Sequence, residues 1–364
     1  MKTILNVIDT TGPGGAETVF TQLAAEIAKK NFRSIALIRG PGWVEQQLKE
    51  LGVKYYIIDC KGSFNLSYLK SMVKLIRTEK IDIIQSHLLG SNVYSSIAGF
   101  LTRTPVISTF HGVVDISPNE RFRSIKLLAL RLGSRKIITV TDKIKKTVTA
   151  LPILSESQVS TIYNGVDTNA FKRIANSNFR DKIGISNNEI LIGSLGNIRK
   201  PKNYPLAIET IKKLHDQNIF AHYAIAGQGN DSQKAPLFEL ITKHNLEKYI
   251  HLVGFVEDTQ AFLSSLDIFL MSSSSEGHPL ALTQSMASET PIVSTKSGVE
   301  EIVENGVEAL IVDSNTATDL AEKVKTIISN TTLRQNITDK ALNKAQTQFS
   351  LAAMFKSYFT FYEE

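Results

Sequence analysis

Short apolar runs alternate with longer amphipathic stretches from one end of the chain to the other. The apolar runs are rich in β-branched residues and have the lengths of buried strands. In the first half they predict strands at residues 3–8, 34–38, 55–58, 81–85, 106–109, 136–140 and 159–162. In the second half they predict strands at residues 190–195, 221–226, 250–253, 267–271, 291–294 and 309–312.

The stretches between these runs predict helices. In residues 16–30, Val19, Leu23 and Ile27 recur every four positions on one helical face, and residues 204–217 show a similar spacing. Strand followed by helix, repeated many times, predicts parallel sheets that helices cover on both faces. The predicted fold class is therefore α/β, with doubly wound parallel sheets.

The chain of 364 residues exceeds the roughly 250–300 residues that one hydrophobic core usually serves, so two domains are expected. The polar, asparagine-rich residues 164–188 mark the boundary. We predict a first domain over residues 1–168 and a second over residues 169–348. Residues 341–364 have a helical pattern that ends in many aromatic side chains. Because these would be costly to leave in water, we expect residues 349–364 to pack back on the first domain.

The charge balance narrows the class of partner. The formal net charge of +6 suits a phosphate-bearing partner such as a nucleotide, a nucleic acid or an anionic lipid. The single cysteine, Cys60, excludes an internal disulfide or a multi-cysteine metal site and favours a reducing compartment. The sequence shows neither a signal-peptide pattern nor an apolar run of about 20 residues. We therefore expect a cytoplasmic protein that at most contacts the inner face of the cell membrane.

Ligands of open parallel sheets bind beyond the carboxyl ends of the strands, so the loops there carry most of the chemistry. Gly14 and Gly15 stand between the first predicted strand and helix, where glycine lets the backbone approach a ligand. This loop is neither a G-x-G-x-x-G pattern nor a P-loop, and a plain glycine turn is an equal alternative. His87 and His111 follow two strands of one predicted sheet. For them a packing role and a functional role are equally open, and neither belongs to a zinc motif.

Two loops of the second half carry further chemistry. Residues 196–203 bring three cations, among them Arg199 and Lys202, onto one turn where they would neutralise a diphosphate; a solvated basic loop is the alternative. Residues 272–287 form a serine-rich turn and then a helix, with Pro279 predicted at its first position. The unpaired N–H groups of that helix start would hold phosphate oxygens. No Asp-x-Asp pair occurs, so we expect no metal ion and no other cofactor to be required.

Several of these pieces, in their order and spacing, resemble glycosyltransferase family 4, a family of retaining enzymes with the GT-B fold, over nearly the whole chain. The matching pieces are Gly14-Gly15-Ala16-Glu17, Thr109-Phe110-His111-Gly112, Ile162-Tyr163-Asn164-Gly165-Val166-Asp167, residues 196–203, Ala226-Gly227-Gln228-Gly229, Leu252-Val253-Gly254-Phe255-Val256 and Ser275-Glu276-Gly277-His278-Pro279-Leu280 followed by Ser285-Met286-Ala287. The resemblance implies two Rossmann-like domains facing a central cleft.

The resemblance also implies a role for each matching position. His111 would lie near the reacting sugar, Lys202 would contact the donor diphosphate, and Glu276 would hold hydroxyls of the donor sugar; these three would be catalytic. The remaining positions would bind the donor, with Phe255 and Val256 forming the base pocket largely through backbone: Gly14, Gly15, Asn197, Arg199, Gly227, Phe255, Val256, Gly277, His278, Pro279, Leu280 and Gln284. Glu17 and His87 would lie on the acceptor side.

Two positions depart from the family pattern. Asn197 stands where an arginine usually follows the glycine, and we hypothesise that Arg199 supplies the missing charge. The family pattern of Glu, seven residues and Glu begins at Glu276 but ends in Gln284. Glutamine keeps an acceptor for the ribose hydroxyls but carries no charge, so ribose binding is expected in weakened form.

The expected reaction transfers a sugar from a UDP- or GDP-sugar to a hydroxyl of a glycan or lipid-linked saccharide in cell-surface polysaccharide synthesis. The resemblance implies retention. Because no carboxylate is clearly placed as a nucleophile, a front-face departure assisted by the diphosphate is preferred. A sugar-nucleotide epimerase and a non-catalytic nucleotide-sugar binding protein of the same fold stay open as alternatives. No nucleic-acid partner is expected, and a nicotinamide dehydrogenase is disfavoured because the dinucleotide pattern is missing.

Residues 121–135 mix basic and apolar side chains. Their cations are Arg121, Arg123, Lys126, Arg131 and Arg135, and they alternate with phenylalanine, isoleucine and leucine. This mixture suits contact with an anionic membrane. A partly buried helix with a solvated basic rim is equally compatible with the pattern.

Overall fold

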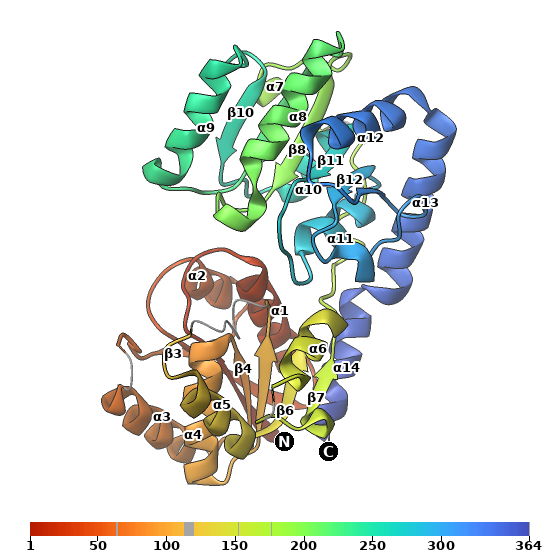
Figure 1. The fold of residues 1–364 in the computed structure, drawn as a ribbon. Helices are drawn as coiled ribbons and strands as arrows, with labels where there is room; N and C mark the ends of the chain where they lie inside the picture. Colours follow the sequence, from red (N-terminus) through yellow and green to blue (C-terminus); the bar gives the residue numbers. More distant parts are fainter. Residues whose placement is uncertain (63–64, 113–119, 152, 176, 364) are drawn as a thin grey trace. The chain divides into compact units, whose positions relative to one another are not determined.

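A computed structural model describes residues 1–62, 65–112, 120–151, 153–175 and 177–363 of the chain. It divides into two compact units, Met1–Asn164 together with Met354–Glu364, and Gly165–Ala353. We had expected the divisions after residues 168 and 348, and Glu364 of the expected terminal segment lies outside the described residues. Each unit is built on one parallel sheet with helices packed on its faces (Figure 1).

The sheet of the N-terminal unit has seven strands in the order β3-β2-β1-β4-β5-β6-β7, and all its neighbours pair in parallel. Every strand that the apolar runs predict in this half is present, with ends shifted by a few residues. The strands are β1 (Lys2–Ile8), β2 (Phe32–Ile38), β3 (Lys54–Ile57), β4 (Ile83–His87), β5 (Val106–Phe110), β6 (Ser134–Thr139) and β7 (Val159–Thr161).

Helices cover both faces of this sheet because its strands are apolar on both sides. Leu5 and Val7 of β1 share a core with Met72 of α3, whereas Ile8, on the other side of the same strand, packs with Phe20 of α1. The helices of this half are α1 (Gly15–Lys29), α2 (Trp43–Glu50), α3 (Leu66–Thr78), α4 (Leu89–Thr102), α5 (Arg123–Gly133), α6 (Asp142–Thr149) and the 3₁₀ turn η2 (Glu156–Gln158).

The C-terminal unit repeats this architecture with a six-stranded parallel sheet in the order β10-β9-β8-β11-β12-β13. Its predicted strands are likewise all present: β8 (Ile190–Leu195), β9 (Ala221–Ala226), β10 (Ile250–Gly254), β11 (Ile268–Met271), β12 (Ile292–Thr295) and β13 (Leu310–Val312). The helices are α7 (Phe179–Lys182), η3 (Lys200–Lys202), α8 (Tyr204–Asp216), α9 (Asp231–Lys243), α10 (Thr259–Ser265), α11 (Leu280–Ala287), η4 (Val299–Glu301), α12 (Ala317–Ser329) and α13 (Thr331–Gln348).

The end of the chain forms two helices where the helical pattern of residues 341–364 predicted one. Helix α13 ends at Gln348 and α14 (Leu351–Glu363) begins after two residues outside any helix. Phe349 is buried with its ring edge-on to His278, and its carbonyl accepts a hydrogen bond from the N–H of Val166 at 2.8 Å. These contacts hold Phe349 in a non-helical position, so α13 and α14 are separate helices. The aromatic residues of α14 pack in the N-terminal unit, where Phe355, Tyr358, Phe359 and Tyr362 are buried.

The strand order of each sheet places the candidate loops. In the N-terminal unit β1 lies between β2 and β4, and in the C-terminal unit β8 lies between β9 and β11. In each unit the second and third strands thus lie on one side of the first strand, and the fourth strand lies on its other side. Such a reversal opens a crevice at the carboxyl ends of the two strands that flank it, which is where open α/β sheets bind ligands. No helix among the described residues is long and apolar enough to cross a membrane.

Candidate functional site

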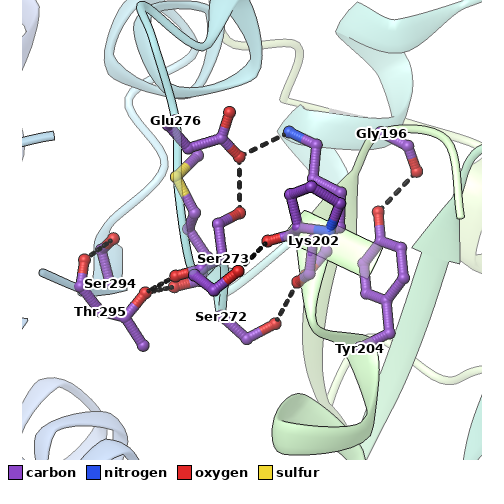
Figure 2. A network of polar contacts seen from close by, with 12 residues as sticks. Gly196, Lys202, Tyr204, Ser272, Ser273, Glu276, Ser294 and Thr295 are labelled. Carbon is purple, nitrogen blue, oxygen red and sulfur yellow. Dashed lines mark hydrogen bonds and ion pairs between the residues drawn. The ribbon is translucent and has the colours of Figure 1, made fainter. Parts of the chain in front are cut away.

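In the C-terminal unit, hydrogen bonds to backbone carbonyls join the loops after β8 and β11. The N–H of Ser274 donates to the carbonyl of Pro201 at 2.8 Å, and Ser272 Oγ donates to the carbonyl of Lys202 at 2.9 Å. Thr295 Oγ1, at the end of β12, donates to the carbonyl of Ser273 at 2.6 Å. These hydrogen bonds hold the turn η3 against the loop after β11 (Figure 2). We call these two loops, residues 196–203 and 272–280, the β8–β11 site.

A charged pair occupies this site. Lys202 Nζ lies 2.8 Å from Glu276 Oε1, and the two side chains are only 23% and 11% exposed. Ser273 Oγ donates to the same carboxylate oxygen at 2.5 Å. Figure 2 shows the ammonium and the carboxylate pointing toward one another from the two loops. Because the pair is largely withdrawn from water, its charges act on a ligand with less screening than surface charges would.

Glycines let the strand ends pack closely enough to form the site. Gly196 has φ +152, and a Cβ there would lie 2.9 Å from Lys202 Cε. A Cβ on Gly227, after β9, would lie 1.9 Å from the carbonyl oxygen of Gly196, a contact that no side chain tolerates. Tyr204 OH donates to that same carbonyl at 2.5 Å. The backbone around Lys202 is thus held on both sides.

The two departures from the family pattern have defined places. Asn197 Oδ1 accepts a hydrogen bond from the N–H of Gln228 at 3.0 Å, so this residue joins the loops after β8 and β9. The side chain of Arg199 is exposed at the start of η3. Gln284 is the one residue of α11, a helix described in full, that is not buried. Asn197 thus lies at the carboxyl edge of the sheet, whereas Gln284 lies about one turn into α11.

The helix start after the serine-rich turn differs by one position from the prediction. Pro279 precedes α11 at the N-cap, with φ −72 and ψ 115, and Leu280 is the first helical residue. The carbonyl of Pro279 accepts a hydrogen bond from the N–H of Leu282 at 3.0 Å, as expected of an N-cap residue. His278 is buried against Phe349, and Gly277 is partly exposed between His278 and Glu276.

An exposed aromatic ring stands beyond β10. Gly254, with φ +72, ends that strand, and Phe255 follows it with 47% of its surface exposed. Val256 is partly exposed. A phenylalanine ring in this setting offers a flat apolar face to a ligand ring.

The N-terminal unit carries a second set of candidate residues at its own carboxyl edge. Gly14 is the extended N-cap of α1, and its carbonyl accepts from Thr18 N–H and Oγ1, both at 2.9 Å. Glu17 lies in the first turn of that helix, where the helix dipole favours a negative charge. A Cβ on Gly14 would lie 2.3 Å from Glu17 Oε2, and Gly15 is exposed.

Two histidines of this unit are in contact. β4 extends to His87, and its register places His87 beside Thr109 of β5, so His111 just beyond β5 reaches His87. His87 Nδ1 and His111 Nε2 are 2.9 Å apart. His87 is completely buried, with the ring of Phe20 edge-on to it. Burial lowers the pKa of His111 to about 4, and burial followed by the neighbouring His111 holds the pKa of His87 well below its usual range.

His87 lies within its strand and is buried, whereas its role on the acceptor side stays a prediction. The prediction put His87 after a strand, but it is the last residue of β4 and its side chain is 0% exposed. It therefore reaches a ligand only through His111. No sequence pattern predicted Ser273 or the buried polar residues around His87, namely Gln85, Thr109 and Tyr362. Serine and glutamine inside a strand or a loop give no distinctive pattern, although a polar run in a buried strand was a usable signal.

Among the described residues, no three His, Cys, Asp or Glu side chains are grouped so that they could hold a metal ion. The two charged residues brought together are Lys202 and Glu276, within one unit. Their arrangement offers an ammonium to an anion and a carboxylate to hydroxyl groups. This is a chemistry of binding and charge stabilisation.

Comparison with known proteins adds two family matches. The family described as Glycosyltransferase Family 4 matches residues 13–170, and the family described as Glycosyl transferases group 1 matches residues 175–344. The chain is similar to the O-antigen biosynthesis glycosyltransferase WclY of Escherichia coli, with 32% identity over 142 residues. That match covers 39% of this chain and 38% of the relative's length.

A longer match joins the chain to the UDP-Gal:alpha-D-GlcNAc-diphosphoundecaprenol alpha-1,3-galactosyltransferase of Escherichia coli, with 26% identity over 69% of this chain and 67% of that protein. Among solved structures, HepE of Anabaena in complex with UDP and glucose superposes with a TM-score of 0.90. It is 20% identical, and the match covers 100% of both chains. The fold of two parallel-sheet, Rossmann-like units is thereby that of the GT-B proteins.

Proposed function

We propose that this chain, which belongs to the group 1 glycosyltransferases, transfers a sugar from a nucleoside diphosphate sugar to a hydroxyl acceptor in the synthesis of a surface polysaccharide. The observation that carries the proposal is the Lys202–Glu276 pair. Its two charges stand 2.8 Å apart on the two loops that flank the strand-order reversal of the C-terminal unit. A ligand bound there needs both a negative group and hydroxyls, and a sugar diphosphate has both.

The donor is assigned to the β8–β11 site piece by piece. Lys202 Nζ binds the diphosphate, and Glu276 accepts hydrogen bonds from hydroxyls of the donor sugar. The N–H groups at the start of α11 take further phosphate oxygens. The ring of Phe255 stacks on the base, and Gln284, the partly exposed residue of α11, binds the ribose. We propose a UDP-sugar, because the names of the relatives mention UDP-Gal and UDP; a GDP-sugar is the alternative.

The reaction is proposed to proceed with retention of the anomeric configuration. The bond between the anomeric carbon and the diphosphate oxygen breaks as the acceptor oxygen attacks the same face, and the acceptor proton passes to the departing diphosphate. Lys202 and the helix start stabilise the negative charge that develops on the diphosphate. No metal ion or other cofactor is part of this proposal. His111, with its pKa near 4, takes part as an uncharged group.

A lipid-linked saccharide is the proposed acceptor, since one relative is named for a diphosphoundecaprenol substrate. Such an acceptor lies at a membrane, and a surface of the N-terminal unit suits that location. Helices α4 and α5 lie against each other and together expose large apolar side chains: Phe100, Leu101, Phe122, Ile125, Leu128 and Leu132. We call these residues the α4–α5 surface. Exposed cations border it, namely Arg103, Arg121, Arg131 and Arg135.

The charge of this border favours an anionic lipid surface as the occupant of the α4–α5 surface. Vesicles of phosphatidylcholine with phosphatidylglycerol should carry the protein upward in a flotation gradient at low salt. The double variant Leu128→Glu with Leu132→Glu should stay at the bottom. Phe238→Glu, which changes an equally exposed phenylalanine in α9, should float like the parent chain. An absence of flotation by the parent chain at low salt contradicts the membrane proposal, and dimer formation lost in the double variant would assign the surface to a second copy.

The function itself is tested with a panel of UDP- and GDP-sugars. Mass spectrometry should detect release of one nucleoside diphosphate by slow donor hydrolysis, and faster release when a saccharide acceptor is added. NMR of the glycoside product should show the anomeric configuration of the donor. An isomerised sugar nucleotide formed without acceptor would favour the epimerase alternative. Donor binding without any turnover would favour the binding protein.

A further inference from the structure

We infer that Gln85 and His87 are positioning residues that hold His111 as the tautomer with its hydrogen on Nδ1. The inference rests on the proposed function only for the claim that His111 contacts substrate. The tautomer itself follows from a line of hydrogen bonds in the N-terminal unit, of which all but the last, between the two histidines, are buried. We call this line the histidine network: Tyr362, Gln85, Thr109, His87 and His111.

The line begins at the C-terminal helix. Tyr362 OH donates to Gln85 Oε1 at 2.9 Å, which turns the amide nitrogen of Gln85 the other way. That nitrogen lies 3.0 Å from Thr109 Oγ1 and 3.3 Å from His87 Nε2. The carbonyl of Ser86 is a third and more distant neighbour of this nitrogen, at 3.5 Å. An amide nitrogen has two hydrogens and accepts none, and we assign them to the two nearer acceptors, Thr109 Oγ1 and His87 Nε2. His87 Nε2 is therefore an acceptor and carries no hydrogen.

The tautomer of His87 then determines the tautomer of His111. An uncharged histidine has one N–H, and with Nε2 bare the hydrogen of His87 sits on Nδ1. His87 Nδ1 lies 2.9 Å from His111 Nε2 and donates to it. His111 Nε2 is thereby an acceptor, and the hydrogen of His111 must be on its own Nδ1. In this assignment every imidazole nitrogen is either a donor or an acceptor, and each hydrogen bond between the side chains has one of each.

Burial makes this order costly to break. Gln85, His87, Thr109 and Tyr362 are each 0% exposed, so no water is at hand to replace a lost partner. A proton added to His87 would place a further N–H group and a positive charge in a dry setting beside the ring of His111. Both histidines are accordingly uncharged near neutral pH, which is the condition that the tautomer argument needs.

The opposite arrangement is a definite alternative. If the amide of Gln85 were turned over, its nitrogen would donate to Tyr362 OH and its oxygen would accept from His87 Nε2–H. Every donor along the line would then reverse, and the hydrogen of His111 would be on Nε2, facing His87. In that case His111 would offer a substrate only a bare nitrogen. In the arrangement inferred here it offers an N–H, so His111 acts as a hydrogen-bond donor to a substrate oxygen and not as a base.

The tautomers are read directly by NMR of the full chain labelled with ¹⁵N in histidine. Long-range ¹H–¹⁵N correlations distinguish an imidazole with hydrogen on Nδ1 from one with hydrogen on Nε2, and His87→Asn and His111→Asn identify the two signals. We expect both residues to show a protonated Nδ1 and a bare Nε2 at pH 7. A protonated Nε2 on His111 in the folded parent chain overturns the inference, whatever the activity of the protein is.

Two variants test whether the network positions His111. Tyr362→Phe removes the hydroxyl that orients the amide while keeping the ring, and Gln85→Leu removes the amide. Each should give His111 a mixture of tautomers and lower kcat on the order of tenfold, with the donor KM unchanged. Lys356→Ala, on the exposed face of α14, is the matched control and should alter neither. If both variants keep the tautomer and kcat of the parent chain, the positioning role is wrong. If the tautomer is as inferred but no sugar nucleotide is turned over, the proposed function fails and the network stands.

Discussion

Single residues decide how tightly the proposed donor is held. Gln284 takes the place of a family glutamate, and it is the one partly exposed residue of α11. Asn197 takes the place of a family arginine, but its side-chain oxygen Oδ1 accepts a hydrogen bond from the N–H of Gln228. The two replacements thus have different consequences. Gln284 changes a group that is proposed to contact the ligand, whereas Asn197 joins the loops after β8 and β9.

The first prediction concerns Gln284. In Gln284→Glu a carboxylate replaces an amide opposite the ribose hydroxyls, and a charged acceptor forms the stronger hydrogen bond. We expect the donor KM to fall several-fold, a gain of about 1 kcal/mol, while kcat stays as in the parent chain. Steady-state kinetics with the preferred sugar nucleotide measure both constants. Gln346→Glu, on the exposed side of α13, serves as the control. Equal donor KM in Gln284→Glu and the parent chain would remove Gln284 from the ribose contact.

The second prediction concerns pH. The pKa of His111 is lowered to about 4 by burial, whereas an unfolded histidine titrates near 6.5. Between these pH values His111 is protonated in the unfolded chain and uncharged in the folded chain. The free energy of unfolding therefore falls as pH falls through this window. Denaturant titrations at pH 7, 6 and 5 should show this loss, and His111→Gln should show a smaller one. A pH dependence identical in His111→Gln and the parent chain would contradict the assignment; His244→Gln is the remote control.

Elements were predictable where periodicity alone determines them. The apolar runs located the strands because buried parallel strands are apolar on both faces and short. The predicted β4 ended at Gln85, and the structure continues it to His87. The contact between His87 and His111 was beyond the reach of the pattern, because it depends on the register that sets His87 beside Thr109. Two residues 24 apart in sequence carry no local signal of such a pairing.

The sequence pointed to Lys202 and to Glu276 separately, but it did not predict that the two side chains form an ion pair. A basic turn after β8 and a glutamate after β11 were both visible as loops after strands. That their side chains meet at 2.8 Å depends on the hydrogen bonds from the Ser272 hydroxyl and the Ser274 N–H to carbonyls of the turn η3. The break between α13 and α14 was missed for a similar reason, since it results from the packing of Phe349 on His278.

The third prediction concerns α14. Tyr358 is 1% exposed, and its hydroxyl lies 3.3 Å from Thr109 Oγ1. Tyr358→Ala should lower the free energy of unfolding by about 3–5 kcal/mol through the cavity that it leaves. Tyr358→Phe keeps the ring and should cost about 1 kcal/mol for the lost hydrogen bond. Urea titration of the full chain measures both values. A change below about 1 kcal/mol in Tyr358→Ala would show that α14 is not part of the core of the N-terminal unit.

At the scale of the whole molecule, two units share one topology but carry different chemistry. Each sheet reverses its strand order beside its first strand, and each has glycines at the carboxyl edge. The C-terminal unit holds the charged pair, whereas the N-terminal unit holds uncharged imidazoles. Fold and family were accessible from the sequence because many weak motifs occur in order.

The fourth prediction follows from this division. Because the diphosphate is assigned to the C-terminal unit, UDP should slow amide hydrogen exchange in residues 196–203 and 272–280. The same ligand at about 100 times its Kd stabilises the state that binds it by about 2.7 kcal/mol. Hydrogen-exchange mass spectrometry with and without UDP measures the effect in each peptide. Protection confined to other peptides of the chain would place the nucleotide elsewhere.

The central claim is that Lys202 stabilises the departing diphosphate, and the rate of nucleoside diphosphate release tests it most directly. Lys202→Met keeps the apolar stem that packs on Gly196 and removes the charge beside Glu276. With the preferred donor at saturation, we predict that kcat falls by about 10²–10³. Lys213→Met, an exposed lysine of α8, should keep the parent rate. A Lys202→Met protein that folds like the parent chain and releases nucleoside diphosphate at the parent rate would contradict the account.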